Sequence, residues 1–255
     1  MFTNAIVRTP SASLINGITT SAHLGKPNYE QALIQHQEYI NALVDCGLKI
    51  TKLPPLEEFP DSCFVEDVAL LTEHFAVLTR PGALTRRNEV EEIRDAVQSF
   101  YSDAIYTINS PGTLEAGDVM RADNHFFIGL SQRTNPEGAA QLKNYLTQHG
   151  FTASTVQLSE YLHLKTGASY LDQNRLLVTG ELTNRSEFKE FNQIRIDKKE
   201  EYAANCILIN GTVLMPKGYP ETFQALTELN YTIIEIDLSE FRKIDGGLSC
   251  LSLRF

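Results

Sequence analysis

The chain of 255 residues has no tryptophan, three methionines and no C-x-x-C pair among its four cysteines. Those cysteines stand far apart in the sequence, and no histidine cluster accompanies them, so neither a metal site nor another cofactor is expected. No apolar run approaches the roughly 18 residues that a membrane-spanning helix needs. These absences argue against a zinc-binding protein and against an integral membrane protein.

Basic residues are also in deficit, with 22 lysines and arginines against 32 acidic residues and a formal net charge of −10. An acidic chain is a poor match for nucleic acid or for an anionic membrane surface, and we expect neither as a partner. It favours a cationic small molecule as the partner instead. The composition does not decide whether the protein forms a homodimer. The segment from Met1 to Arg8 lacks the pattern of a signal peptide, which predicts a cytoplasmic location.

A repeat of about 50 residues runs along the chain. Four predicted hairpins have their turns near residues 73, 123, 173 and 210, and the last contains the strong turn signal Asn210-Gly211. A Gly or Pro breaker follows each hairpin. Helical patterns come after most breakers, at residues 89–100, 136–150 and 220–229, whereas the stretch after Gly180 is only weakly helical. Short strands then follow at residues 104–108, 155–158, 194–196 and 232–236.

The repeating unit is therefore strand, strand, helix, strand. A fifth copy forms only if a strand at residues 248–253 pairs with residues 5–7, followed by a helix at 29–46 and a strand at 48–53. This predicts an α/β fold of five pseudo-symmetric ββαβ blades in one domain, residues 1–255, with the ring closed by the two terminal strands. An ordinary α/β sheet with accidental spacing is the alternative.

One unusual polar residue precedes the first hairpin strand of several repeats. Glu66 with Asp67, Glu115 and His163 are separated by steps of 49 and 48 residues, which follow the repeat itself. Cys250 takes the matching place near the chain end, after the pair Gly246-Gly247. Taken singly, a strand cysteine is usually a small core residue. Equivalent positions around one axis converge, however, so we expect carboxylates, an imidazole and a thiol to meet, as nucleophilic catalysis requires.

Several carboxylates beside a thiol need a cation to neutralise them. A planar guanidinium binds carboxylates in a bidentate manner and presents an electrophilic carbon to sulfur. Arg86 and Arg133 each follow a hairpin, and either one could hold a carboxylate of the same ligand.

The runs Phe59-Pro60-Asp61-Ser62-Cys63-Phe64-Val65-Glu66-Asp67, Leu114-Glu115-Ala116-Gly117-Asp118, His163-Leu164-Lys165-Thr166-Gly167 and Lys243 to Cys250 resemble the dimethylarginine dimethylaminohydrolase family of the guanidine-modifying pentein superfamily. The resemblance extends from Arg8 to Phe255. It implies a five-bladed αβ propeller, in agreement with the repeat. The segment Gly17–Gly25 departs from the family pattern by Ile18 in place of leucine and by one additional residue.

The resemblance also implies roles for individual residues. Cys250 would be the nucleophile, His163 the general acid and base, and Glu115 the third member of the triad. Substrate contacts are implied for Asp67 at the guanidinium, Asp61 at the α-amino group, Arg86 and Arg133 at the α-carboxylate, and for Glu66, Phe64, Ile18 and Ile244.

The implied activity is hydrolysis of Nω,Nω-dimethyl-L-arginine and Nω-monomethyl-L-arginine to L-citrulline and a methylamine, through a covalent thiouronium on cysteine and without a cofactor. One alternative is a deiminase acting on free arginine, although the chain lacks the helical insertion of that group. A non-catalytic ribosome-binding ring protein is an alternative of another class, and it would need a basic surface, which this chain does not have.

Overall fold

The computed structural model describes all residues, 1–255, in two compact units. Unit 1 combines residues 1–65 with residues 206–255, and unit 2 comprises residues 66–205. None of the helices is long and apolar enough to cross a membrane.

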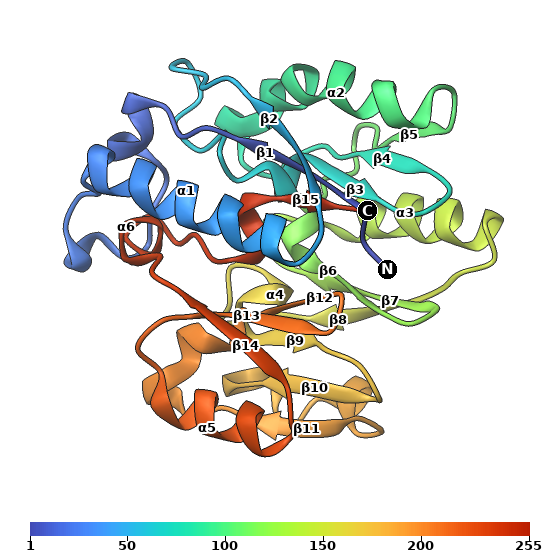
Figure 1. Cartoon of the computed structure of the whole chain (residues 1–255). Coiled ribbons are helices and arrows are strands. Elements are labelled where there is room, and N and C mark those ends of the chain that lie inside the picture. The colour runs from blue at the N-terminus through green and yellow to red at the C-terminus, as the bar shows by residue number, and fades with distance from the viewer. The chain divides into compact units, whose positions relative to one another are not determined.

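Unit 1 contains two three-stranded sheets. The first has the order β15-β1-β2, in which β1 pairs antiparallel with β15 and parallel with β2. Figure 1 shows the two chain ends on these adjacent strands. The second sheet has the order β12-β13-β14. The elements are β1 (Asn4–Arg8), α1 (Tyr29–Asp45), β2 (Lys49–Leu53), β12 (Ile207–Ile209), β13 (Thr212–Pro216), α5 (Pro220–Glu228), β14 (Thr232–Ile236), α6 (Ser239–Arg242) and β15 (Leu253–Arg254).

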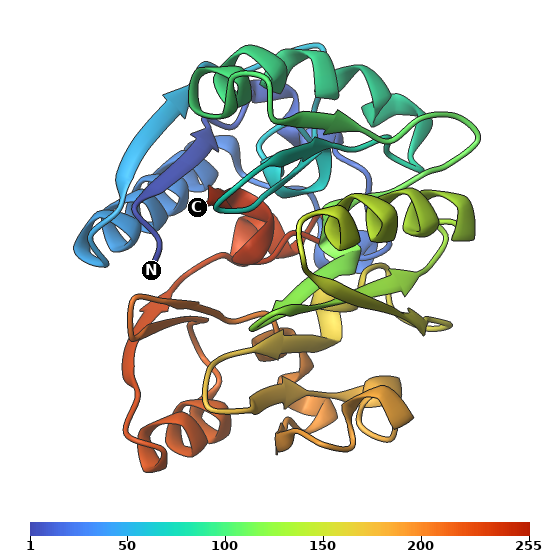
Figure 2. The same cartoon turned by 90° about the vertical axis from the view of Figure 1, so that its right-hand side faces the viewer.

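Unit 2 contains three sheets of the same kind, ordered β3-β4-β5, β6-β7-β8 and β11-β10-β9. In each, a hairpin is extended by a parallel strand that arrives after a helix or helical turns. Figure 2 shows α3 against β7 and β8. The elements are β3 (Ala69–Leu71), β4 (Ala76–Leu78), α2 (Glu91–Tyr101), β5 (Ile105–Thr107), β6 (Val119–Ala122), β7 (His125–Leu130), α3 (Pro136–Gln148), β8 (Thr152–Gln157), α4 (Leu164–Gly167), β9 (Ala168–Tyr170), β10 (Arg175–Val178) and β11 (Asn192–Arg195).

The helices begin where the sequence supplies caps. The side chain of Asn28 accepts a hydrogen bond from the amide of Gln31 at the start of α1. Asn135 does the same for Gly138 at the start of α3, and Pro136 occupies the first helical position. The weakly helical stretch after Gly180 forms two short 3₁₀ turns, at Gly180–Leu182 and Ser186–Phe188. Each unit buries its own apolar core beneath these elements.

The predicted repeat is confirmed in all five sheets, including the pairing of the terminal strands, with 3₁₀ turns in place of an α-helix between β10 and β11. One local prediction was wrong, because Cys250 does not lie on a strand. Residues Ser249–Leu251 form a 3₁₀ turn, closed by a hydrogen bond from the Cys250 amide to the carbonyl of Gly247. Strand β15 consists only of Leu253 and Arg254, so the pairing with β1 involves the last residue of the predicted strand and the residue after it.

The glycine pair before Cys250 does not supply a left-handed backbone conformation at this turn. Neither Gly246 nor Gly247 has a positive φ; Asp245 has one instead, at 59°. Gly246 is needed for close packing, because a Cβ there would lie 2.4 Å from the ring of Phe64. Gly246 thus allows the turn before Cys250 to pack tightly against Phe64.

Candidate active site

The predicted site residues fall into two clusters, one in each unit. We call Ile18, Asp61, Phe64, Ile244 and Cys250 in unit 1 the Cys250 cluster. We call Glu66, Asp67, Arg86, Glu115, Arg133 and His163 in unit 2 the His163 cluster.

In the His163 cluster, a carboxylate and an imidazole form a direct pair. The Nε2 atom of His163 lies 2.8 Å from Oε2 of Glu115, and both side chains are buried. The other oxygen of Glu115 accepts a hydrogen bond from the amide of Ala83. Glu115 precedes the 3₁₀ turn Ala116–Asp118, and His163 precedes α4, so two loop ends at matching places in neighbouring repeats supply the pair. The spacing of 48 residues in the sequence predicted this juxtaposition.

Asp67 lies beside the pair. Its Oδ1 atom is 3.9 Å from Nε2 of His163 and accepts a hydrogen bond from the amide of Gly117. A Cβ at Gly117 would lie 2.8 Å from both Asp67 Oδ1 and His163 Nδ1, so only glycine allows Asp67 and His163 to approach this closely. The sequence Leu-Glu-Ala-Gly-Asp therefore provides both the Glu115 carboxylate and the space beside it.

The charges of the cluster shift the pKa values in opposite directions. Burial opposes the charged form of His163, but the charge of Asp67, the hydrogen bond that His163 donates to Glu115 and the charge of Asp118 outweigh it and raise its pKa to about 9. Burial also opposes the charged form of Glu115, yet His163 and Arg86 hold its pKa well below its usual range. The pair therefore consists of an imidazolium and a carboxylate at neutral pH.

Arg86 makes contacts that the sequence argument did not anticipate. Its guanidinium forms ion pairs with Asp67, at 2.5 Å, and with Glu89, at 2.8 Å, and all three side chains are buried. Arg133 is more open, with 18% of its side chain exposed, and its nearest ion-pairing carboxylate atom is Oε1 of Glu115 at 3.9 Å. Arg86 thus stabilises the carboxylates of the cluster, whereas Arg133 is the more accessible cation.

A second unanticipated ion pair involves Glu66. Nζ of Lys165 lies 2.6 Å from Oε1 of Glu66, and both groups are largely buried. Lys165 belongs to the His163-Leu164-Lys165 motif, so the motif itself carried a signal that the sequence argument did not use. The three predicted carboxylates of unit 2, Glu66, Asp67 and Glu115, thus each have a cationic partner.

Ligand atoms of Asp67, Glu115 and His163 lie within 4.8 Å of one another, a spacing that could also hold a metal ion. The hydrogen bond between His163 and Glu115 and the ion pair between Arg86 and Asp67 account for this spacing by themselves. A metal is not needed to explain why these groups converge.

In the Cys250 cluster, Asp61 and Phe64 are buried and lie on the loop that precedes Glu66 in the sequence. Oδ1 of Asp61 accepts a hydrogen bond from the amide of Ile18, at 3.0 Å. The Ile18 side chain is 37% exposed, and Ile244 is buried. The Cys250 residue is only partly buried, so it is not an ordinary core cysteine like Cys206.

The segment that carries Ile18 is tied down at a second point. Asp245 accepts hydrogen bonds from the amide of Thr20 at 2.5 Å, from the Thr20 hydroxyl at 2.9 Å and from the Ser21 hydroxyl at 2.7 Å. These bonds join the segment 14–25 to the turn that precedes Cys250.

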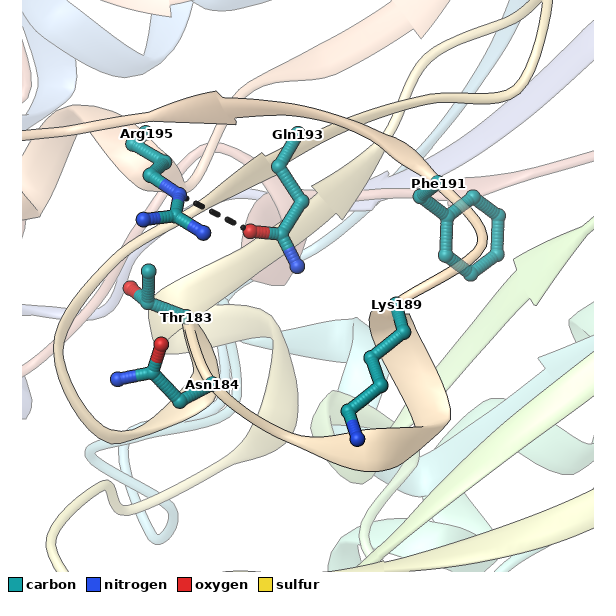
Figure 3. Close-up of a pocket in the computed structure, with 6 residues that line it drawn as sticks. All are labelled: Thr183, Asn184, Lys189, Phe191, Gln193 and Arg195. Carbon is teal, nitrogen blue, oxygen red and sulfur yellow. Dashed lines mark hydrogen bonds between the residues drawn. The ribbon is translucent and has the colours of Figure 1, made fainter.

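A surface hollow of about 450 Å³ lies elsewhere in unit 2 (Figure 3). Its lining contains no predicted site residue; it consists of Thr183, Asn184, Lys189, Phe191, Gln193 and Arg195. Within this hollow, Nε of Arg195 donates to Oε1 of Gln193 at 3.2 Å. The hollow lies beside β11 and does not involve the His163 cluster.

Comparison with known proteins gives the family. Residues 4–252 match the model of a family described as N,N dimethylarginine dimethylhydrolase, eukaryotic. A curated N(G),N(G)-dimethylarginine dimethylaminohydrolase from Pseudomonas aeruginosa is 54% identical over 255 residues, which is the full length of both chains. Two solved structures of dimethylarginine dimethylaminohydrolase match this chain over its full length and over their own full length. One is a cysteine-to-serine mutant of the Pseudomonas aeruginosa protein with citrulline, at 53% identity and a TM-score of 0.99. The other is a histidine-to-glycine variant in an adduct with S-methyl-L-thiocitrulline, at 53% identity and a TM-score of 0.98.

The fold comparison confirms the predicted fold class, a five-bladed αβ propeller. The family model and the full-length relative agree with each other and with the motifs of the sequence. The chain belongs to the dimethylarginine dimethylaminohydrolase family.

Proposed function

We propose that this protein hydrolyses Nω,Nω-dimethyl-L-arginine to L-citrulline and dimethylamine, and that Nω-monomethyl-L-arginine is a second substrate. Full-length similarity to a curated dimethylarginine dimethylaminohydrolase supports this activity. So does a solved relative that contains citrulline. The observation in this chain that carries the proposal is the buried hydrogen bond between Glu115 and His163 beside Asp67.

In the first half of the proposed reaction, the thiolate of Cys250 attacks the guanidinium carbon and forms a C–S bond. His163 donates its proton to the departing nitrogen, the C–N bond breaks, and dimethylamine leaves. The raised pKa of His163 favours this step, because the imidazole is already protonated at neutral pH. The product on the enzyme is an S-alkylthiouronium.

In the second half, neutral His163 accepts a proton from water, and the oxygen attacks the thiouronium carbon. The C–S bond then breaks and the hydroxyl proton of the adduct is lost to water, which releases citrulline and restores the Cys250 thiolate beside protonated His163. Glu115 stabilises the imidazolium in both halves and fixes the ring through the bond to Nε2.

The contacts to the rest of the substrate are also part of the proposal. Asp67 and Glu66 bind the guanidinium, Arg133 and Arg86 bind the α-carboxylate, and Asp61 with the main chain of Ile18 and Ile244 binds the α-amino group. Phe64 packs against the alkyl chain of the substrate. Arg86 is ion-paired with Asp67, so its guanidinium has to bind Asp67 and the substrate α-carboxylate at the same time.

Segment 14–25 is proposed as a lid over the substrate, with its fastening at Asp245 and Asp61. The homodimer and the cytoplasmic location stay predictions.

The function is tested by incubating purified protein with dimethylarginine, monomethylarginine and arginine, and by measuring citrulline together with the released amine. We expect citrulline and dimethylamine in equal amounts from dimethylarginine, and little or no ammonia from arginine. Preferential release of ammonia from arginine would identify a deiminase, and no citrulline from any of the three would reject the proposal.

A further inference from the structure

Asp118 is a buried carboxylate that the proposed reaction does not use. It ends the 3₁₀ turn Ala116–Asp118, three residues after Glu115, and it has no exposed surface. Such a group is costly to bury unless it is fully hydrogen-bonded. Each of its oxygens receives a bond from a different loop of the His163 cluster.

The first of these bonds leads to His163. Oδ1 of Asp118 accepts a hydrogen bond from the amide of Leu164 at 3.0 Å. Leu164 directly follows His163 and begins α4. The bond therefore fixes the backbone at the point where the His163 side chain leaves it.

The second bond leads to Arg133. The hydroxyl of Ser131 donates to Oδ2 of Asp118 at 2.7 Å. The same hydroxyl oxygen accepts from the amides of Arg133 at 2.9 Å and Thr134 at 3.2 Å. Because Ser131 gives its only proton to Asp118, its oxygen is oriented toward these two amides. Asp118 thus sets the backbone of the Arg133 loop through Ser131.

A third connection returns to Glu115. The hydroxyl of Thr134 accepts a hydrogen bond from the amide of Glu115 at 3.2 Å. The loops that carry Glu115, Arg133 and His163 are therefore joined through Asp118 and the two hydroxyl groups.

We propose that Asp118 is a positioning residue that holds the acid–base residue His163 and the carboxylate-binding residue Arg133 in register through the Leu164 amide and Ser131. The proposal rests on the proposed function, since it concerns the same site. Asp118 touches no reacting atom. Its effect is transmitted through the two loops and, above the pKa of about 6 to which burial raises its carboxyl, through its negative charge. The charged groups facing His163 are Asp67, Glu115 and Asp118, with Arg86 beside Asp67.

Two substitutions distinguish the connection of Asp118 to His163 from its connection to Arg133. Asp118→Asn keeps the size of the side chain but removes its charge and one acceptor, so the Ser131 proton loses its partner. Ser131→Ala removes only the hydrogen bonds that link Asp118 to the Arg133 loop. It leaves the Asp118 charge and the bond from the Leu164 amide in place. Ser131→Thr retains the hydroxyl and serves as the conservative rescue variant. Asp197→Asn is the control for charge, because Asp197 is an exposed residue of the same unit that caps the 3₁₀ turn Lys198–Ala204.

Steady-state kinetics with dimethylarginine from pH 6 to 10 provide the first readout. Ser131→Ala is expected to raise KM about tenfold, the loss typical of one charge-assisted hydrogen bond, with kcat within about twofold and an unchanged pH profile. Asp118→Asn is expected to lower kcat/KM by more than about tenfold and to move the basic limb of kcat to lower pH. Ser131→Thr and Asp197→Asn should behave like the wild type.

An NMR titration of the His163 ring provides a readout that does not depend on turnover. The His163 pKa should fall in Asp118→Asn and stay unchanged in Ser131→Ala, whereas a purely structural role would lower only the melting temperature. A folded Asp118→Asn protein with wild-type kinetics and an unchanged His163 titration would overturn the inference. Wild-type protein without activity on dimethylarginine would instead reject the proposed function, so the two failures are distinguishable.

Discussion

The Nε2 atom of His163 lies 2.8 Å from Oε2 of Glu115, and 3.9 Å from Oδ1 of Asp67. With Asp118, which also faces the ring, three buried carboxylates surround one imidazole. This arrangement favours the imidazolium form of His163, which the proposed acid role requires.

The first prediction concerns Glu115→Gln. The amide keeps the shape of the side chain but removes the charge that stabilises the imidazolium, so kcat should fall by roughly 10²–10⁴-fold. Wild-type activity needs the protonated ring and is lost as pH rises through the His163 pKa, which is raised to about 9. In Glu115→Gln this basic limb should move to lower pH. Rate measurements from pH 6 to 10 test the shift, and a basic limb that stays in place would show that Glu115 does not set the His163 charge.

The second prediction concerns stability against pH. The pKa of His163 is raised in the folded protein from an ordinary value of 6.5 to about 9. The stabilisation is therefore fully present below about pH 6.5 and is lost as pH rises through about 9, by an amount on the order of 3 kcal/mol.

Urea unfolding at several pH values measures this loss. His163→Gln should remove most of the decline between pH 6.5 and 9, while His74→Gln, at an exposed position, should leave it unchanged. Parallel curves for the wild type and His163→Gln would contradict the assignment.

The third prediction separates the two arginines. Arg86→Ala leaves Asp67 and Glu89 buried without their cation, so it should lower the free energy of unfolding by about 3–5 kcal/mol. Arg133 is partly exposed and has only a distant ion pair, so Arg133→Ala should change stability by less than about 1 kcal/mol.

Kinetics complete this comparison. Arg133→Ala should lower kcat/KM for dimethylarginine about tenfold or more. For a dimethylarginine analogue that lacks the α-carboxylate, the same substitution should lower kcat/KM much less. Equal losses for both substrates would remove Arg133 from the proposed carboxylate site.

The fourth prediction concerns the lid fastening at Asp245. Asp245→Asn tolerates the positive φ at this position but weakens the three hydrogen bonds from Thr20 and Ser21. Hydrogen exchange in residues 14–25 should become faster, and KM should rise. Asp237→Asn, which alters a cap at Ser239 in the same unit, is the matched control. Citrulline should slow exchange across this segment in the wild type, and equal exchange with and without citrulline would argue against a lid.

Much of the fold followed from local sequence signals. The Asn210-Gly211 turn and the proline at the start of α3 each specify structure within a few residues, so this hairpin and this helix could be predicted. The spacing of about 50 residues showed that the same unit recurs along the chain. The turn at Cys250 could not, because alternating polar and apolar residues also suit a strand, and packing of Gly246 against Phe64 decides the outcome.

Within unit 2, the convergence of Glu115 with His163 was predictable from the sequence, whereas the other partners of these loops were not. Repeat positions placed Glu115 and His163 together. The pairing of Arg86 with Asp67 and Glu89, and of Lys165 with Glu66, depends on side-chain geometry across loops, for which the sequence carries no periodic signal.

The central claim is that Cys250 forms a covalent thiouronium during turnover. Acid quenching of the enzyme during reaction with dimethylarginine, followed by mass spectrometry of the peptide that contains Cys250, tests this directly. The account predicts a mass increase on Cys250 equal to the substrate minus dimethylamine, with no adduct and no citrulline from Cys250→Ser. Citrulline formation by Cys250→Ser at the rate of the wild type, or an adduct on another cysteine of the wild-type protein, would contradict it.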